Sequence, residues 1–290
     1  MIEGIRLDHV ALALERASDG WPRYATELGG RWVTGGDAPG FTAVQLAYAN
    51  RMRLELLEPA RVEANDFLRR FLDRSGPGPH HVTFKVDELE GALEAVRSAG
   101  LEPVGVDTSR PGWKEAFLHP RQAHGVVVQL AQAAGGGSAR PPAGFPPDPA
   151  GGAPAELVHV AHAVADLDRS LELFCGLLGG RTDGRGQGRW GRWVDLTWGG
   201  PGLVRLMAPA GDVGGLRTWL GGRSGRVHHL AFRCADPAGV TGAMPCEGGD
   251  GEAESWVVEP EGNLGTRLLL LGGAGAAGAG AVPATGGSAG

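Results

Sequence analysis

The chain has 290 residues, a net charge of −6 and 42% hydrophobic residues, which is enough apolar sequence for a sizeable core. Because no basic surplus is present to hold a phosphate backbone, nucleic acid is excluded as an expected partner. Three scattered cysteines give no disulfide framework, and no signal-peptide pattern or long apolar run is present, so we expect a cytoplasmic protein that does not contact the membrane.

Glycine and proline collect in two stretches of the chain. Residues 132–156 have no periodic apolar pattern and are predicted to be a linker, and residues 272–290 are predicted to be a disordered tail of low complexity. Two blocks of similar size remain, so we expect one domain over residues 1–131 and a second over residues 157–271.

The first block opens with an alternating strand, LDHVALAL. Side chains alternate across a strand, so Val10, Leu12 and Leu14 share one face, and His9 shares the opposite face with Leu7. A helical stretch should follow each opening strand, and the face with the large apolar residues should pack on that helix.

Further strands are predicted at FTAVQLAYA, RMRLELLE, HHVTFKV, EAFLHP and GVVVQLAQ, with a helix over residues 86–100 between the third and the fourth. Alternation places Glu55, His81 and Gln129 opposite the apolar face of their strands. A lone histidine on a strand is usually a satisfied, partly buried residue. Four potential ligands on four strands of one curved sheet, however, indicate a metal site, since a buried carboxylate without a partner is costly.

The second block repeats the first. It opens with LVHVAHAV, whose His159 lies 150 residues after His9, and HHLAFRC places His229 where HHVTFKV places His81. Each block therefore contains two βαβββ units. The predicted fold class is α+β, with four βαβββ modules arranged as two paired-module domains with curved mixed sheets.

These motifs resemble the vicinal oxygen chelate superfamily of glyoxalases, extradiol dioxygenases and antibiotic-resistance proteins. In the first block, LDHVALAL, LELLEP, GPGPHHVTFKVDEL and FLHPRQAHGVVVQL most resemble the methylmalonyl-CoA epimerase branch. The resemblance implies one divalent metal ion (Co, Ni, Mn, Fe or Zn) held by His9, Glu55, His81 and Gln129. Gln129 departs from the epimerase pattern, which usually has Glu at this position.

The second block departs further from the pattern. Arg205 stands where the first block has Glu55, and a cation there opposes metal binding. Leu269 lies near the Gln129 position, and the stretch DPAGVTGAMPCEGG is a poor helix former. We therefore expect a degenerate glyoxalase-like domain without metal, whose tryptophans either line an apolar pocket or pack in the core.

The resemblance implies a metal-dependent isomerase, epimerase or lyase that stabilises an enolate of a small acyl-CoA or oxo-acid substrate. The general base is not assigned; Gln45, Lys114 and Glu115 are the candidates. Two other functions remain open, a non-catalytic drug- or ligand-binding resistance protein and a ring-cleaving dioxygenase of the extradiol type. The protein is expected to be a monomer built as an internal pseudo-dimer, or a homodimer.

Overall fold

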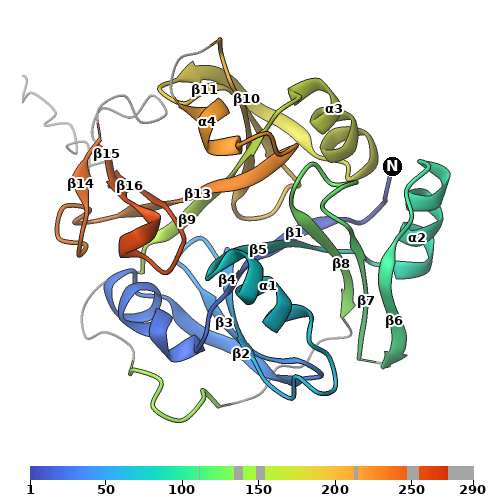
Figure 1. The fold of residues 1–290 in the computed structure, drawn as a ribbon, viewed down its shortest axis with the longest axis horizontal. Helices are drawn as coiled ribbons and strands as arrows, with labels where there is room; N and C mark the ends of the chain where they lie inside the picture. The colour runs from blue at the N-terminus through green and yellow to red at the C-terminus, as the bar shows by residue number, and fades with distance from the viewer. Residues whose placement is uncertain (111, 134–139, 148–153, 212–214, 247–254, 274–290) are drawn as a thin grey trace, which may run out of the picture.

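The computed structural model describes residues 1–110, 112–133, 140–147, 154–211, 215–246 and 255–273. They form two mixed eight-stranded sheets, one from each half of the chain (Figure 1). The N-terminal sheet has the spatial order β2 (Arg31–Ala38), β3 (Phe41–Ala47), β4 (Arg53–Pro59), β1 (Arg6–Ala13), β5 (Gly78–Lys85), β8 (Val127–Ala133), β7 (Trp113–Leu118), β6 (Val104–Arg110).

The C-terminal sheet repeats this order strand for strand. It runs β10 (Arg181–Gly188), β11 (Gly191–Thr197), β12 (Leu203–Ala208), β9 (Glu156–Val164), β13 (Gly225–Cys234), β16 (Leu268–Gly272), β15 (Ser255–Val258), β14 (Met244–Pro245). In both sheets the first strand of a module pairs in parallel with the last strand of the same module, and the two modules meet through antiparallel first strands. The predicted α+β fold of two paired-module domains is confirmed, with a module helix in three of the four units among the described residues.

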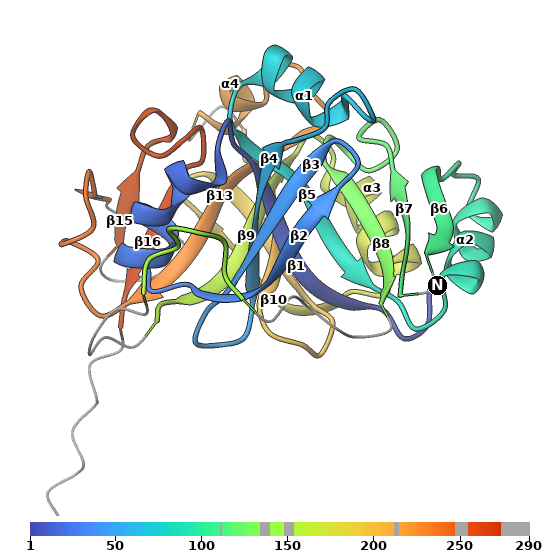
Figure 2. The same cartoon turned by 90° about the horizontal axis from the view of Figure 1, so that it is seen from below.

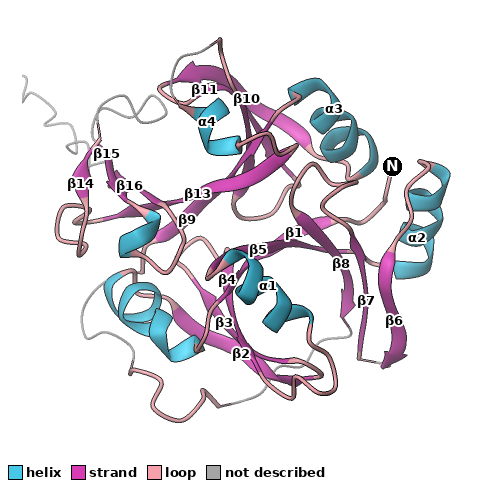
Figure 3. Cartoon of the chain, in the orientation of Figure 1, coloured by secondary structure: helices cyan, strands magenta, loops and turns pink. Residues whose placement is uncertain are grey.

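Helices are few and follow the opening strands of the modules (Figure 3). In chain order they are η1 (Ala17–Gly20) and η2 (Trp21–Glu27) after β1, α2 (Leu89–Ser98) after β5, and α3 (Leu167–Leu171) with η3 (Glu172–Leu177) after β9. No helix is described between β13 and β14, as the Pro- and Gly-rich sequence there predicts. Two connecting helices, α1 (Phe67–Ser75) and α4 (Leu216–Leu220), join the modules of each pair, and the short η4 (Pro260–Gly262) precedes β16.

The main core lies between each sheet and its module helices. Helix α2 contributes Leu89, Leu93 and Val96 to this core, at helical spacing. Gly100 follows its end with φ of +75°, a conformation that favours glycine and stops the helix. None of the helices among the described residues is long and apolar enough to span a membrane.

One strand face differs from the alternation pattern. Leu7 was predicted to share a face with His9, but it lies in the main core with Val10 and Leu12. The pairing of β1 with β5 explains the difference, because Leu7 pairs with Phe84 and His9 with Thr83, which leaves Asp8 as an extra residue. Such a β-bulge reverses the alternation of side chains on the strand.

The two halves of the chain share this main core. Tyr48 stacks edge-on against Phe232, with ring centroids 4.9 Å apart, and Trp198 packs against Phe84 at 4.8 Å. Tyr48 and Trp198 each follow the second strand from the sheet edge, and Phe84 and Phe232 hold matching positions on β5 and β13. The contacts are therefore reciprocal, as at a two-fold interface.

A pair of glycine contacts repeats this reciprocity. A Cβ atom on Gly125 would lie 1.9 Å from the carbonyl oxygen of Gly225, and one on Gly265 would lie 1.9 Å from that of Pro77, beside Gly78. Backbones of the two halves thus approach each other so closely at two matching places that only glycine fits.

The predicted linker and tail fall partly outside the described residues, at 134–139, 148–153 and 274–290. At the end of the predicted linker, the Ala155 amide donates to Leu28 O, and the Ala49 amide donates to Ala155 O. The start of the second half is therefore tied to the first half before β9 begins. The boundaries 1–131, 132–156, 157–271 and 272–290 remain predictions.

Candidate metal centre

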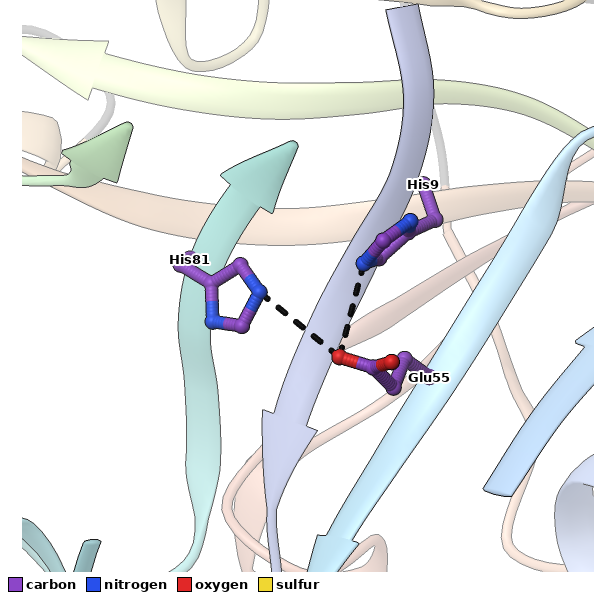
Figure 4. A group of neighbouring side chains, drawn as sticks. All are labelled: His9, Glu55 and His81. Carbon is purple, nitrogen blue, oxygen red and sulfur yellow. Dashed lines mark ion pairs between the residues drawn. The ribbon is translucent and has the colours of Figure 1, made fainter. Parts of the chain in front are cut away.

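Three neighbouring strands at the middle of the N-terminal sheet bring His9, Glu55 and His81 together (Figure 4). The central strand β1 pairs with β4 on one side and β5 on the other, and Ala11 is the register partner of both Glu55 and His81. Register partners project to the same face of a sheet. The small side chain of Ala11 leaves space between the two, and His9 enters this space from two residues earlier.

All three side chains are buried, and their polar atoms face one another. Nε2 of His9 lies 3.4 Å from Oε2 of Glu55, and Nε2 of His81 lies 3.7 Å from the same oxygen. Neither Nε2 atom has a hydrogen-bond partner, and buried polar atoms are almost always paired. Ligand atoms about 2.1 Å from one metal ion lie about 3 to 4 Å apart, so the donor set and its spacing fit a divalent cation.

A contact at Nδ1, the ring nitrogen that does not face Glu55, orients each of the two histidine rings. Nδ1 of His9 lies 2.8 Å from Oδ2 of Asp8, and Nδ1 of His81 lies 2.8 Å from Nδ1 of His80. A hydrogen bond at one ring nitrogen fixes the tautomer and directs the other nitrogen to a metal. The Asp8 carboxylate is itself held by Lys85 Nζ at 3.3 Å.

Sequence reasoning missed Asp8 and His80 as functional residues. Each is the extra residue of a β-bulge in the β1–β5 pairing, where Leu12 pairs with Pro79 directly after Ala11 with His81. A bulge allows two consecutive side chains to meet. The doublets Asp8–His9 and His80–His81 are the only signal in the sequence, and simple alternation sends their members to opposite faces.

The charges of the cluster depend on one another. Burial by itself lowers the pKa of His9, but the charge of Glu55 and the hydrogen bond to Asp8 outweigh it and raise this pKa to about 9. Burial by itself raises the pKa of Glu55, but the positive charge of His9 lowers it to about 2. Burial and the neighbouring His80 hold the pKa of His81 well below its usual range. His81 is therefore neutral at physiological pH, as a metal ligand must be.

Gln129, the fourth predicted ligand, lies beside the cluster but is engaged elsewhere. Its Oε1 accepts a hydrogen bond from Thr83 Oγ1 at 2.6 Å, and its Nε2 donates to Glu115 Oε2 at 2.8 Å. Thr83 is its register partner on β5. The structure thus brings three of the four predicted ligands together and holds the fourth amide between Thr83 and Glu115.

The three candidates for the base are in different surroundings. Gln45 Nε2 donates to Glu55 Oε1 at 2.9 Å, so Gln45 holds the Glu55 carboxylate in place. Glu115 reaches the cluster through Gln129 and also accepts from Trp113 Nε1 at 2.8 Å. Lys114 is apart from the cluster and lines a separate small cavity with Arg6 and other residues.

Residues 7–147 match the family model described as a glyoxalase-like domain. The N-terminal half is a glyoxalase-like domain of the vicinal oxygen chelate superfamily. Over this half the chain is similar to the ethylmalonyl-CoA/methylmalonyl-CoA epimerase of Cereibacter sphaeroides, with 28% identity over 133 residues, which are 44% of this chain and 97% of that protein. It is also similar to the uncharacterized protein YqjC of Bacillus subtilis, with 29% identity over 134 residues, 45% of this chain and 94% of that protein.

A solved structure resembles most of the chain, across both halves. A hypothetical protein from Staphylococcus aureus aligns with a TM-score of 0.55 and 11% identity, covering 92% of this chain and 98% of that one. At this identity the likeness concerns the fold alone. It covers both eight-stranded sheets, whose strand orders are the same.

In the C-terminal glyoxalase-like sheet, the position of Glu55 is taken by Arg205. Its Nε and Nη2 atoms donate to the two carboxylate oxygens of Asp195 at 2.6 and 2.7 Å. Asp195 pairs with Arg205 in the same register in which Gln45 pairs with Glu55. A buried, bidentate ion pair therefore replaces an amide–carboxylate pair, and the position offers no metal ligand.

The histidines of this second half are hydrogen-bonded in a chain. Arg267 Nη1 lies 2.7 Å from His228 Nε2, and an arginine can only donate. The proton of His228 is then on Nδ1, which lies 2.8 Å from His229 Nδ1, and His229 donates from Nε2 to His159 Nε2 at 3.2 Å. His229 Nε2 thus carries a proton and does not have the lone pair that a metal needs. Leu269, at the Gln129 position, is packed in an apolar cluster.

Proposed function

We propose that the protein is a metal-dependent isomerase, epimerase or lyase that moves a proton beside the carbonyl group of a small acyl-CoA or oxo-acid substrate. The observation that carries this proposal is the pair of buried Nε2 atoms of His9 and His81, which have no hydrogen-bond partner and face the Glu55 carboxylate. Two imidazoles and one carboxylate suit Co, Ni, Mn, Fe or Zn. A divalent ion bound there would supply a Lewis acid that stabilises negative charge on the substrate carbonyl oxygen.

Two sets of residues would form the metal site, those that hold the ion and those that orient the ligands. His9, Glu55 and His81 would hold the ion. Asp8 orients the first of these and Gln45 the second. Gln129 adds an amide oxygen as fourth ligand if its side chain turns away from Thr83.

Glu115 is the group to which we assign the proton transfer. It is a carboxylate within hydrogen-bond distance of Gln129, and its side chain is 16% exposed. Trp113 and Gln129 donate to Oε2, while Oε1 lies 3.4 Å from Arg110 Nη2 and is the oxygen that takes the proton. On the other side of the cluster, Gln45 contacts Glu55, but it is an amide that accepts no proton at neutral pH. One base serves an isomerase or lyase directly, whereas an epimerase also needs a proton donor on the opposite face.

The substrate class rests on the relative from Cereibacter sphaeroides, which by its name acts on ethylmalonyl-CoA and methylmalonyl-CoA. These two thioesters are therefore the first substrates to test. A ring-cleaving dioxygenase of the extradiol type normally holds its metal in the C-terminal pair. The protonated Nε2 of His229 and the Arg205–Asp195 ion pair oppose that arrangement.

The test is α-proton exchange in deuterated water, followed by NMR over a panel of acyl-CoA thioesters and oxo acids, with oxygen uptake recorded in parallel. We expect metal-dependent exchange without oxygen uptake. Glu115→Gln should slow it by about 10² or more, the usual contribution of a general base, while Glu90→Gln on the exposed face of α2 leaves it unchanged. Metal-loaded protein that exchanges no member of the panel, or that consumes oxygen with a catechol, would contradict the proposal.

A further inference from the structure

A cavity of about 550 Å³ opens on the face of the C-terminal sheet on which α4 packs, away from the His9–Glu55–His81 cluster. This volume lies within the range of small-molecule sites in proteins, about 300 to 1,000 Å³. Its walls come from β13, β15, α4, the turn before β11 and the residues that follow β15 and precede β16. The residues on which the argument depends are Trp190, Trp219, Arg226, His228, Glu259 and Arg267.

The cavity arises from a difference between the two connecting helices, which both lie on the upper side of the molecule in Figure 2. In the N-terminal half α1 has nine residues, and its Phe67 and Phe71 pack on the His80 ring, with centroids 5.6 and 4.7 Å away. In the C-terminal half α4 has only five residues, and the ring centroid of its Trp219 lies 5.1 Å from that of the matching histidine, His228. The shorter helix covers less of the sheet.

The described part of the cavity wall carries more positive than negative charge. Among the residues that the structure describes, three arginines and one carboxylate, Glu259, line the cavity. Arg267 binds Glu259 through Nε and Nη2 at 2.8 and 2.6 Å, so this pair is neutral. Arg226 has no carboxylate partner among the described residues.

Arg226 and Arg267 crowd the same indole ring. Their guanidinium carbons lie 4.4 and 4.5 Å from the centroid of Trp219. Burial together with the like charges of Arg223 and Arg267 lowers the pKa of Arg226, because neighbouring positive charges repel each other. An anion placed against Arg226 relieves this repulsion and accepts two parallel hydrogen bonds from its guanidinium.

The apolar part of the wall is aromatic. The Trp190 ring packs on His228 at 5.0 Å and on His229 at 4.9 Å, and both histidines are held neutral by the hydrogen-bonded chain from Arg267. Val257 adds aliphatic surface. A flat ring entering the cavity therefore meets aromatic faces on which it can stack.

We propose that the C-terminal half is a metal-independent binding site for a small aromatic carboxylate, with the carboxylate on Arg226 and the ring between Trp190 and Trp219. The site is independent of the proposed metal centre, because it shares no residue with it. It gives the degenerate half of the chain a binding function of its own.

Isothermal titration of the full chain with 2-naphthoate, and with neutral 2-naphthamide as its isostere, tests the proposal. We expect saturable binding of one naphthoate per chain, with a Kd below about 1 mM, and binding of the amide at least about tenfold weaker. Arg226→Met should weaken naphthoate about tenfold or more, and Trp219→Leu should weaken both compounds, each with a cooperative thermal melt that shows an intact fold.

Two control variants make the outcome decisive. Arg185→Met removes an exposed arginine of β10 outside the cavity, and His81→Ala removes a residue of the metal centre; both should bind naphthoate as the parent chain does. The proposal is overturned by the absence of saturable naphthoate binding, by equal affinity for the amide, or by loss of binding in His81→Ala with Arg226→Met unaffected. The last result would assign the anion to the N-terminal half.

Discussion

The contact between Asp8 and His9 allows the metal centre to be tested without removing a ligand. Asp8 Oδ2 lies 2.8 Å from His9 Nδ1, and its side chain is only 14% exposed. Carboxylates in this position typically change metal affinity by about 10- to 100-fold, which equals about 1.4 to 2.7 kcal/mol. Asp8→Asn keeps an oxygen that accepts the Nδ1 proton but loses the charge, so we expect about tenfold weaker binding. Asp8→Ala loses both, and about 100-fold is expected.

Competition of each variant with a chromophoric chelator measures the affinity directly, with no need for a substrate. Asp87→Asn is the matched control, since Asp87 is exposed and pairs with Arg6 at 2.9 Å on the surface. Unchanged affinity in Asp8→Ala, or an equal loss in Asp87→Asn, would refute the role of Asp8 in orienting His9.

Further predictions concern charge in both halves. The pKa of His9 is raised to about 9 and that of His81 is lowered, so metal binding at neutral pH should release about one proton. Titration calorimetry in buffers of different ionisation enthalpy measures the number released. Release of none or two would contradict the protonated state assigned to His9 and the neutral state assigned to His81. The raised pKa of His9 belongs to the folded state, so protonated His9 stabilises the metal-free protein. This stabilisation is fully present below pH 6.5 and is lost as the pH rises through about 9. Urea unfolding at several pH values across this window measures the change in the free energy of unfolding. In the second half, Arg205→Met leaves the Asp195 carboxylate buried without its partner and should lower the free energy of unfolding by about 3 to 5 kcal/mol. Arg205→Met combined with Asp195→Leu should recover most of this stability. A negligible loss in the single variant would contradict the stabilising role of the Arg205–Asp195 ion pair. Arg205→Glu combined with Asp195→Gln copies the pair found in the first half but leaves the hydrogen-bonded chain from Arg267 to His159 in place. We expect elemental analysis to find still one equivalent of bound metal, and a second equivalent would contradict the proton assigned to His229 Nε2.

The sequence alone located the cluster because two independent patterns agree. Alternation assigned His9, Glu55 and His81 to the polar faces of their strands, and the internal repeat put His9 and His81 at matching positions in successive modules. Both patterns depend only on strand period and module length, which local sequence encodes.

Other features of the site depend on contacts that no local pattern records. The bulges at Asp8 and His80 reverse alternation, so Leu7 was placed on the wrong face and the residues that orient the two histidines were missed. Gln129 was placed on the correct strand and face. Its hydrogen bonds to Thr83 and Glu115 follow from side-chain rotamers across three strands.

The central claim is that a divalent ion binds in the N-terminal half and not in its structural counterpart. Elemental analysis of purified His81→Ala and His229→Ala, each checked for a cooperative thermal melt, tests it most directly. We predict that His81→Ala loses stoichiometric metal and that His229→Ala retains it. Equal loss in both variants, or loss in His229→Ala alone, would contradict the division of the chain into a metal-binding half and a metal-free half.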